Sequence, residues 1–151
     1  MSETPRGPQR LAPAESLGFV VNRLARLFAA ALQRRIAPLG VAPAQFGVLL
    51  LLYERDGQTQ AELARVFEVE QPTMANTLNR MQRDGLIKRA PDPSDARRAL
   101  VRLTTKARRL QQPLITEARA VNAAAVEGLS AGELEALRGA AARVTANLRA
   151  P

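Results

Sequence analysis

The sequence contains neither cysteine nor histidine among its 151 residues. Disulfide bonds, thiol chemistry and zinc sites built on cysteine or histidine are therefore excluded. Cysteine nucleophiles and histidine general acids or bases are excluded for the same reason. Carboxylates, serine, threonine, lysine and the single Tyr53 are left as catalytic groups, and no pattern brings them together. We therefore predict no catalytic residue, no metal and no cofactor, and an enzyme is the least favoured class.

Aromatic residues and long hydrophobic runs are also scarce. Only 3% of the residues are aromatic although 46% are hydrophobic, so the core has to be built from leucine, valine and alanine, which suit packed helices. No apolar run reaches the roughly 18–20 residues that cross a bilayer, and no membrane partner is expected. Residues 1–13 are polar, contain three prolines and lack the hydrophobic segment of a signal peptide. We expect them to form a disordered arm on a cytoplasmic protein.

The positive charge of the chain is concentrated in one segment. The formal net charge is +8, and residues 80–109 carry ten arginines and lysines against three aspartates, a net +7. A clustered basic surface attracts a polyanion by releasing its counterions. The alternative is an ordinary solvated surface in an arginine-rich chain, since 20 of the 22 basic residues are arginine. The pattern around the segment has to decide between the two.

The spacing of apolar residues predicts a mainly α protein with about six helices. The expected helices cover about residues 14–37, 43–54, 60–67, 72–84, 105–128 and 130–148. Capping boxes, in which a hydroxyl and a carboxylate three residues apart satisfy each other's backbone N–H, mark two of the starts. These are Thr59 with Glu62 and Ser130 with Glu133. Pro113 lies inside the fifth helix and should kink it, because proline has no N–H to donate.

The third and fourth of these helices are short and separated by a brief turn, which predicts a helix-turn-helix. The buried side of the second member carries Met74, Leu78 and Met81. At 100° per residue, the opposite side carries Pro72, Thr73, Asn76, Asn79, Arg80 and Arg83. Asparagine and arginine pair with base edges and phosphates, and this side has no acid before Asp84. The pattern therefore favours contact with nucleic acid over plain solvent exposure.

A basic β-hairpin is predicted directly after this helix. Residues 86–89 and 99–103 are short apolar-bearing runs that flank a loop, residues 91–98, rich in proline and aspartate. Arg97 and Arg98 are expected at its tip. The arms carry Lys88, Arg89 and Arg102. Such a hairpin is a wing, and the narrow minor groove of A·T-rich DNA attracts inserted arginine.

Residues 58–108 resemble the multiple-antibiotic-resistance regulator (MarR) family of bacterial winged-helix regulators. The motifs that carry the resemblance are Ala61-Glu-Leu-Ala64, Gln71-Pro-Thr73, Leu78-Asn-Arg-Met81, Asp84-Gly-Leu-Ile87, Asp95-x-Arg97 and Leu103-Thr104. Each is weak alone, but their order and spacing together are specific. The order of the flanking elements extends the resemblance to about residues 14–149.

The resemblance implies a winged helix-turn-helix DNA-binding lobe, residues 41–104. Residues 14–40 and 105–149 are implied to form the dimer platform of a homodimer. It further implies a repressor on a pseudo-palindromic operator in double-stranded DNA, released by a small aromatic or phenolic ligand whose contacts the sequence does not specify. Major-groove reading is implied at Gln71, Pro72, Thr73, Asn76, Thr77 and Arg80. Asp95 would orient Arg97 in the minor groove.

The full set of predicted DNA contacts combines the resemblance with the helix and hairpin patterns. It comprises Gln71, Pro72, Thr73, Asn76, Thr77, Arg80, Arg83, Asp95, Arg97 and Arg98. The main alternative is a winged helix used for protein contact or for nonspecific architectural DNA binding. RNA binding is disfavoured, because no aromatic platform is present on which bases could stack.

Overall fold

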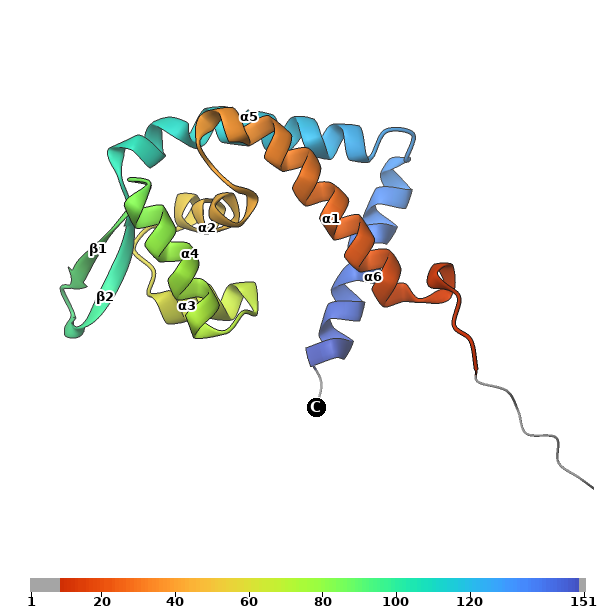
Figure 1. The fold of residues 1–151 in the computed structure, drawn as a ribbon, viewed down its shortest axis with the longest axis horizontal. Helices are drawn as coiled ribbons and strands as arrows, with labels where there is room; N and C mark the ends of the chain where they lie inside the picture. The colour runs from red at the N-terminus through yellow and green to blue at the C-terminus, as the bar shows by residue number, and fades with distance from the viewer. Residues whose placement is uncertain (1–8, 150–151) are drawn as a thin grey trace, which may run out of the picture.

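The computed structural model describes residues 9–149, so most of the predicted N-terminal arm, residues 1–8, lies outside the described residues. The described part contains six α-helices and one two-stranded hairpin (Figure 1). The elements are η1 (Pro13–Glu15), α1 (Leu17–Ile36), η2 (Ala37–Leu39), α2 (Pro43–Glu54), α3 (Gln60–Phe67), α4 (Gln71–Arg83), β1 (Ile87–Asp92), β2 (Asp95–Leu103), α5 (Thr105–Ala125) and α6 (Ala131–Arg149). The predicted fold class, a mainly α winged helix-turn-helix, is confirmed.

The first helix begins later than the sequence pattern predicts. A 3-10 turn, Pro13–Glu15, precedes it, and the Ser16 hydroxyl accepts the N–H of Phe19 as the N-cap. The helix therefore starts at Leu17 rather than at residue 14. At its other end the chain turns through Gly40, whose φ of 76° lies in the left-handed region that glycine adopts without strain.

Helix α2 lies at the centre of the core. Phe46, Val48, Leu49 and Leu52 of this helix are buried, as expected for a helix that is apolar on every side. Around it pack the predicted inner face of α4, together with α3 and the base of the hairpin. The buried residues of these neighbours are Leu63, Ala64, Met74, Leu78, Met81, Ile87, Val101 and Leu103. The winged-helix elements therefore share one hydrophobic core.

Phe67, the last residue of α3, connects this helix to α2. Its side chain is half-buried and packs on the edge of the core. The ring lies against the backbone of Gly47 in α2, so closely that a Cβ built there would come within 2.8 Å of Phe67 Cζ. The absence of a side chain at position 47 is what lets the Phe67 ring pack on α2.

Helices α1, α5 and α6 form a second region beside this core. Figure 1 shows α5 running along the top of the molecule, with α1 crossing it and α6 descending from its far end. Ile36 is the only buried residue of α1, and α6 has none. Large exposed apolar side chains line both helices: Leu17, Phe19, Val20, Val21, Leu24, Leu27, Phe28, Leu137 and Leu148. A single copy of the chain therefore leaves an extensive apolar face uncovered.

Helix α5 joins the two regions. Thr104 caps it by accepting the N–H of Ala107, and its hydroxyl also bonds the carbonyl of Gly85 at 2.6 Å, next to the end of α4. The helix continues through Pro113 and ends at Ala125, three residues before its predicted end. Leu114 is buried in the winged-helix core. The start of α5 is therefore fixed to the same core that holds α4.

No single helix between residues 9 and 149 has the length and hydropathy of a membrane span. The segments Leu17–Leu39 and Pro43–Glu54 meet the criteria only when taken together, and they are bent by 77° where they meet.

Candidate nucleic-acid interface

The helix-turn-helix is built from two local devices. At the start of α3 the Thr59 N–H donates to the Glu62 carboxylate at 2.7 Å, and the Glu62 N–H donates to the Thr59 hydroxyl at 3.2 Å. At its end Glu68 adopts a left-handed conformation, φ 54°, which reverses the chain within a few residues. Pro72 then occupies the first turn of α4, where the missing N–H costs nothing. The predicted capping box and the predicted bounds of α3 are confirmed.

Helix α4 presents the predicted polar side to solvent. Met74, Leu78 and Met81 are buried on one side. The predicted contacts that are exposed are Gln71, Pro72, Thr73, Asn76, Arg80 and Arg83. Six of the seven predicted contacts on this helix therefore share an accessible surface.

Thr77 is the seventh, and it differs from the rest. It is only half-exposed, and its hydroxyl donates to the carbonyl of Thr73 at 3.3 Å. Gln71 is also engaged, because its side-chain carbonyl accepts from Gln60 at 3.2 Å. These local bonds leave Thr73, Asn76 and Arg80 as the side chains of the exposed face without a side-chain hydrogen bond or ion pair to any residue between 9 and 149.

The turn of the hairpin is shorter than predicted, which changes the position of two arginines. Asp92 accepts the Ser94 N–H at 2.9 Å and the Ser94 hydroxyl at 2.7 Å, an arrangement that closes a tight turn. The N–H of Ser94 is also the main reason that the pKa of Asp92 is lowered. Asp92 pairs with Asp95 across this turn. Arg97 and Arg98 therefore lie within β2, and the prediction that they form the tip is wrong.

The register of the hairpin explains how Arg97 and Arg98 reach the surface although they lie within β2. Pro91 pairs with Ala99 while Asp92 pairs with Asp95, so residues 96–98 have no partners and form an irregularity in β2. Such a bulge bends the strand and redirects its side chains. The two arginines have different surroundings, Arg97 beside Asp95 and Arg98 beside Asp92 and the hollow next to α3.

Arg97 projects outward and is held at its inner end. Its backbone N–H and its Nε both donate to Asp95 Oδ1, at 3.0 Å and 3.2 Å. Its side chain is nevertheless 92% exposed, so the outer guanidinium nitrogens are free to bind. The contact between Asp95 and Arg97 that the resemblance implies is present in the structure, and its role on DNA stays a prediction.

Arg98 turns toward the body of the lobe. Its Nε lies 3.8 Å from Asp92 Oδ2. It lines a hollow of about 610 Å³ between α3, the start of α4 and the wing, together with Arg65 and Arg89. Arg65 lies outside the basic segment 80–109, so charge clustering along the sequence gave no signal for it. The tertiary fold is what brings these three cations to one hollow.

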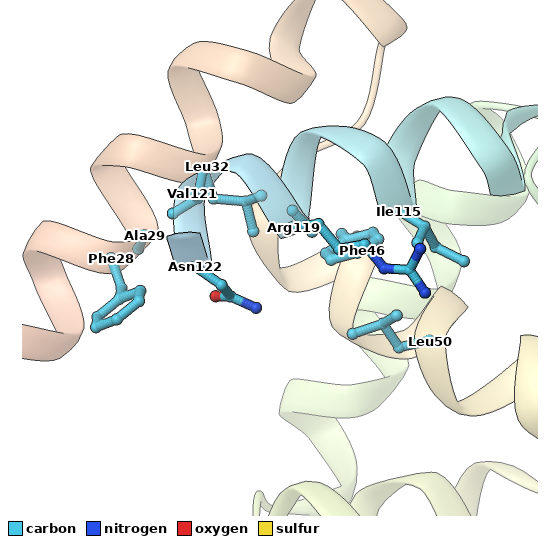
Figure 2. A pocket seen from close by; sticks show the side chains of 10 residues that line it. Phe28, Ala29, Leu32, Phe46, Leu50, Ile115, Arg119, Val121 and Asn122 are labelled. Carbon is cyan, nitrogen blue, oxygen red and sulfur yellow. The ribbon is translucent and has the colours of Figure 1, made fainter. Parts of the chain in front are cut away.

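A second hollow separates the winged-helix core from the α1 and α5 region. Figure 2 shows this pocket of about 340 Å³, with walls from α1, α2 and α5. Its lining residues are Phe28, Ala29, Leu32, Phe46, Leu50, Ile115, Ala118, Arg119, Val121 and Asn122. Arg119 and Asn122 supply its polar side chains, and the Arg119 guanidinium lies on the side of Ile115 and Leu50 (Figure 2). The sequence did not reveal this pocket.

Three solved structures illustrate the similarity of this fold to known proteins. A probable transcriptional regulator from Pseudomonas aeruginosa is 32% identical, with a TM-score of 0.79, over 87% of this chain and 98% of that one. A MarR-family regulator from Listeria monocytogenes, complexed with a 26mer DNA, is 22% identical with a TM-score of 0.81 over 88% and 89% of the two chains. CouR from Rhodococcus jostii RHA1, bound to p-coumaroyl-CoA, is 23% identical with a TM-score of 0.79 over 89% and 95%.

The last two structures support the fold alone, because their sequence identity is low. The Pseudomonas protein is closer in sequence and is covered almost completely by this chain. The sequence model of the MarR family also matches residues 39–98, which run from the end of η2 through most of the wing. The chain therefore belongs to the MarR family of winged-helix transcriptional regulators, which are DNA-binding proteins and not enzymes.

Proposed function

We propose that this protein is a homodimeric repressor that reads a pseudo-palindromic operator with α4 and the wing. The observation that carries the proposal is that one lobe, built on a single hydrophobic core, presents two different reading elements. Helix α4 exposes Thr73, Asn76 and Arg80, and the wing exposes Arg97 on its Asp95 support. This combination fits major-groove reading by a helix and minor-groove insertion of an arginine.

The roles of the α4 side chains follow from their chemistry. Asn76 can bond an adenine edge with both its carbonyl and its amide group, and Arg80 and Arg83 are suited to guanine or phosphate. Pro72 and Thr73 lie in the first turn, where backbone N–H groups also favour phosphate. Thr77 would touch a thymine methyl through its own methyl group, since its hydroxyl is engaged with Thr73. Gln71, Asp95 and Arg98 complete the proposed contact set.

The uncovered apolar face supports the homodimer. Leu24 and Leu27 on α1 and Leu137 on α6 are about half-exposed in the single chain. Large contiguous apolar patches are rare on monomers and mark interfaces. We assign residues 14–40 and 105–149 to this dimer platform and residues 41–104 to the DNA-binding lobe. Two lobes related by a two-fold axis would read half-sites about 10–10.5 bp apart or a multiple of that distance.

The pocket in Figure 2 supports control by a small aromatic anion. Its lining is mostly apolar, and the Arg119 side chain forms no ion pair with any residue between 9 and 149. An aromatic ring in the apolar part and a carboxylate or phenolate beside Arg119 would satisfy both features. The walls come from the platform and from the lobe, so a ligand that fits one arrangement better would favour the corresponding angle between them. Release from DNA follows only if the ligand binds the two arrangements unequally.

Selection of bound duplexes from a random pool tests the DNA-binding proposal. We expect a pseudo-palindromic consensus, and we expect affinity for it to fall steeply with salt because phosphates are neutralised on binding. A gel-shift comparison with scrambled DNA is the control. Equal binding of both duplexes would favour the nonspecific architectural alternative, and a flat salt response would contradict the electrostatic basis of the proposal. If neither duplex is bound, the protein-interaction alternative is favoured.

A further inference from the structure

One cation of the basic segment bonds to α4 instead of projecting into solvent. Arg89 lies on β1 opposite Val101, and its guanidinium donates to two amide side chains of α4. One Nη–H bonds the Gln82 carbonyl, and the other bonds the Asn79 carbonyl at 3.1 Å. Among residues 9–149 no other side-chain hydrogen bond joins α4 to the hairpin, and Arg89 forms no ion pair.

We infer that Arg89 is a positioning residue that locks the wing to α4, an inference that rests on the proposed DNA-reading function. A guanidinium is planar and presents its N–H donors in a fixed fork. Asn79 and Gln82 are three residues apart, so they are neighbours on the helix surface. Two bonds from one planar group to two points on a helix fix both the distance and the rotation between hairpin and helix.

The rest of the hairpin shows why such a lock matters. Its base is anchored by the buried Ile87, Val101 and Leu103. Beyond this base, from the pair Ala90 and Leu100 outward to the Pro93–Ser94 turn, no residue of the hairpin is buried. Arg97 lies in that outer part. Its position relative to the reading side chains of α4 therefore depends on how firmly the outer wing is held.

The lock also assigns a different role to Asn79. This residue lies on the α4 side predicted to face nucleic acid. A bidentate contact with adenine needs both its carbonyl and its NH₂ group. Arg89 takes one of the two lone pairs of the Asn79 carbonyl and turns this side chain toward the wing, so we assign Asn79 to support of the wing and leave base reading to Asn76.

A competing role for Arg89 is direct contact with phosphate, since it also lines the hollow shared with Arg65 and Arg98. The two roles predict different responses. A phosphate contact contributes about one unit to the slope of log affinity against log salt. A positioning residue leaves that slope unchanged and acts through preorganisation, which is worth about two- to tenfold in affinity per side chain held.

The experiment uses the full-length protein with three single changes, Arg89→Ala, Arg89→Lys and Gln82→Ala, and with the double change Arg89→Ala/Gln82→Ala. Lys88→Ala is the matched control from the same strand. Affinity for the selected operator is measured over a salt series. Both Arg89 variants should lose about two- to tenfold with an unchanged slope, because lysine keeps the charge but not the fork. The double variant should lose no more than Arg89→Ala alone, since each change breaks the same lock.

Amide hydrogen exchange in the DNA-free protein supplies a second readout. Arg89→Ala should accelerate exchange at residues 95–101 of the wing, and Lys88→Ala should not. A salt slope lowered by about one in Arg89→Ala and restored in Arg89→Lys would overturn the inference, as would unchanged exchange. If the wild type binds no specific DNA, the proposed function fails, and the exchange result alone then decides whether Arg89 holds the wing.

Discussion

Asp95 accepts two hydrogen bonds from Arg97, one from its backbone N–H at 3.0 Å and one from its Nε at 3.2 Å. The aspartate holds the stem of the arginine in one direction and leaves the outer nitrogens exposed. An arginine constrained in this way loses less conformational entropy when it enters a groove. The pair thus behaves as one preformed unit at the irregular part of β2.

Replacing Arg97 with alanine should weaken binding to the selected operator by about 1–3 kcal/mol, the size of one good DNA contact. Asp95→Ala should cost less, since the cation stays in place and only its orientation is lost. Fluorescence anisotropy with labelled duplex measures both. Arg109→Ala, at an exposed position on α5, removes an equal charge as a control. Tighter binding by Asp95→Ala would mean that repulsion between its carboxylate and phosphate outweighs the orienting bonds.

Asn76→Ala should relax sequence preference more than it weakens nonspecific binding. The side chain is exposed on α4 and is placed to read a base edge. The measurement is the ratio of affinities for the selected operator and for a duplex changed at single positions. An equal loss of affinity on every duplex would instead place Asn76 at a phosphate.

Gly47→Ala should destabilise the winged-helix core by about 1 kcal/mol, the lower end of the range for overpacking, because the clashing atoms lie at the far end of the half-buried Phe67 ring. The new Cβ would come within 2.8 Å of the Phe67 ring. Gly139→Ala is the matched control, because nothing lies within 4 Å of its Cβ position. The control should gain stability, since alanine favours helix over glycine by about 0.5–1 kcal/mol. Urea unfolding measures both, and equal stability of the two variants would contradict the packing of the Phe67 ring on Gly47.

Leu24→Asp should convert the proposed dimer into monomers. Leu24 is 45% exposed in the single chain, so an aspartate there leaves the core intact but cannot be buried against a second copy. Analytical ultracentrifugation gives the mass in solution. Val66→Asp, at a 53% exposed position on α3 outside the platform, is the control and should stay dimeric. A dimer that survives Leu24→Asp would place the interface elsewhere.

Glu62 should contribute a pH-dependent part of the stability. The backbone N–H of Thr59 is the main reason that the pKa of Glu62 is lowered in the folded state. A lowered folded pKa stabilises the protein above the unfolded value, about 4.3 for glutamate, and this gain is lost as the pH falls through the folded pKa. Glu62→Gln should therefore be less stable than the wild type near neutral pH and match it in acid.

A urea series from neutral to acidic pH makes this comparison. Glu135→Gln, at an exposed position on α6, is the control and should show little difference across the series. A gap between Glu62→Gln and the wild type that stays constant down to the acid limit would show that the carboxylate charge is not its source.

Local sequence patterns were sufficient to predict helices α3 and α4 of the helix-turn-helix. The bounds of α3 and its capping box were predicted correctly, because a cap involves side chains and N–H groups only three residues apart. The buried side of α4 also followed from spacing, since Met74, Leu78 and Met81 repeat at the helical period. Interactions between residues so close in sequence depend on the local pattern alone.

The wing shows where local patterns stop being sufficient. Whether Arg97 and Arg98 lie at the tip or within β2 depends on strand register, and the Asp92–Ser94 bonds and the pairing of Asp92 with Asp95 decided it. Register is selected by the pairing of two strands and by the turn that joins them, and neither is visible in one strand alone.

The sequence by itself determined the helices, the helix-turn-helix, the basic segment and the motifs of the family. Only the tertiary structure showed that Arg65, Arg89 and Arg98 line one hollow and that Arg89 bonds to α4. Arg65 meets Arg98 only when α3 packs beside the hairpin, and Arg89 finds its two acceptors only when β1 folds back along α4. The physical reason is that helices and caps form through contacts between neighbours in sequence. The candidate nucleic-acid interface instead consists of residues that a common core brings together from different elements.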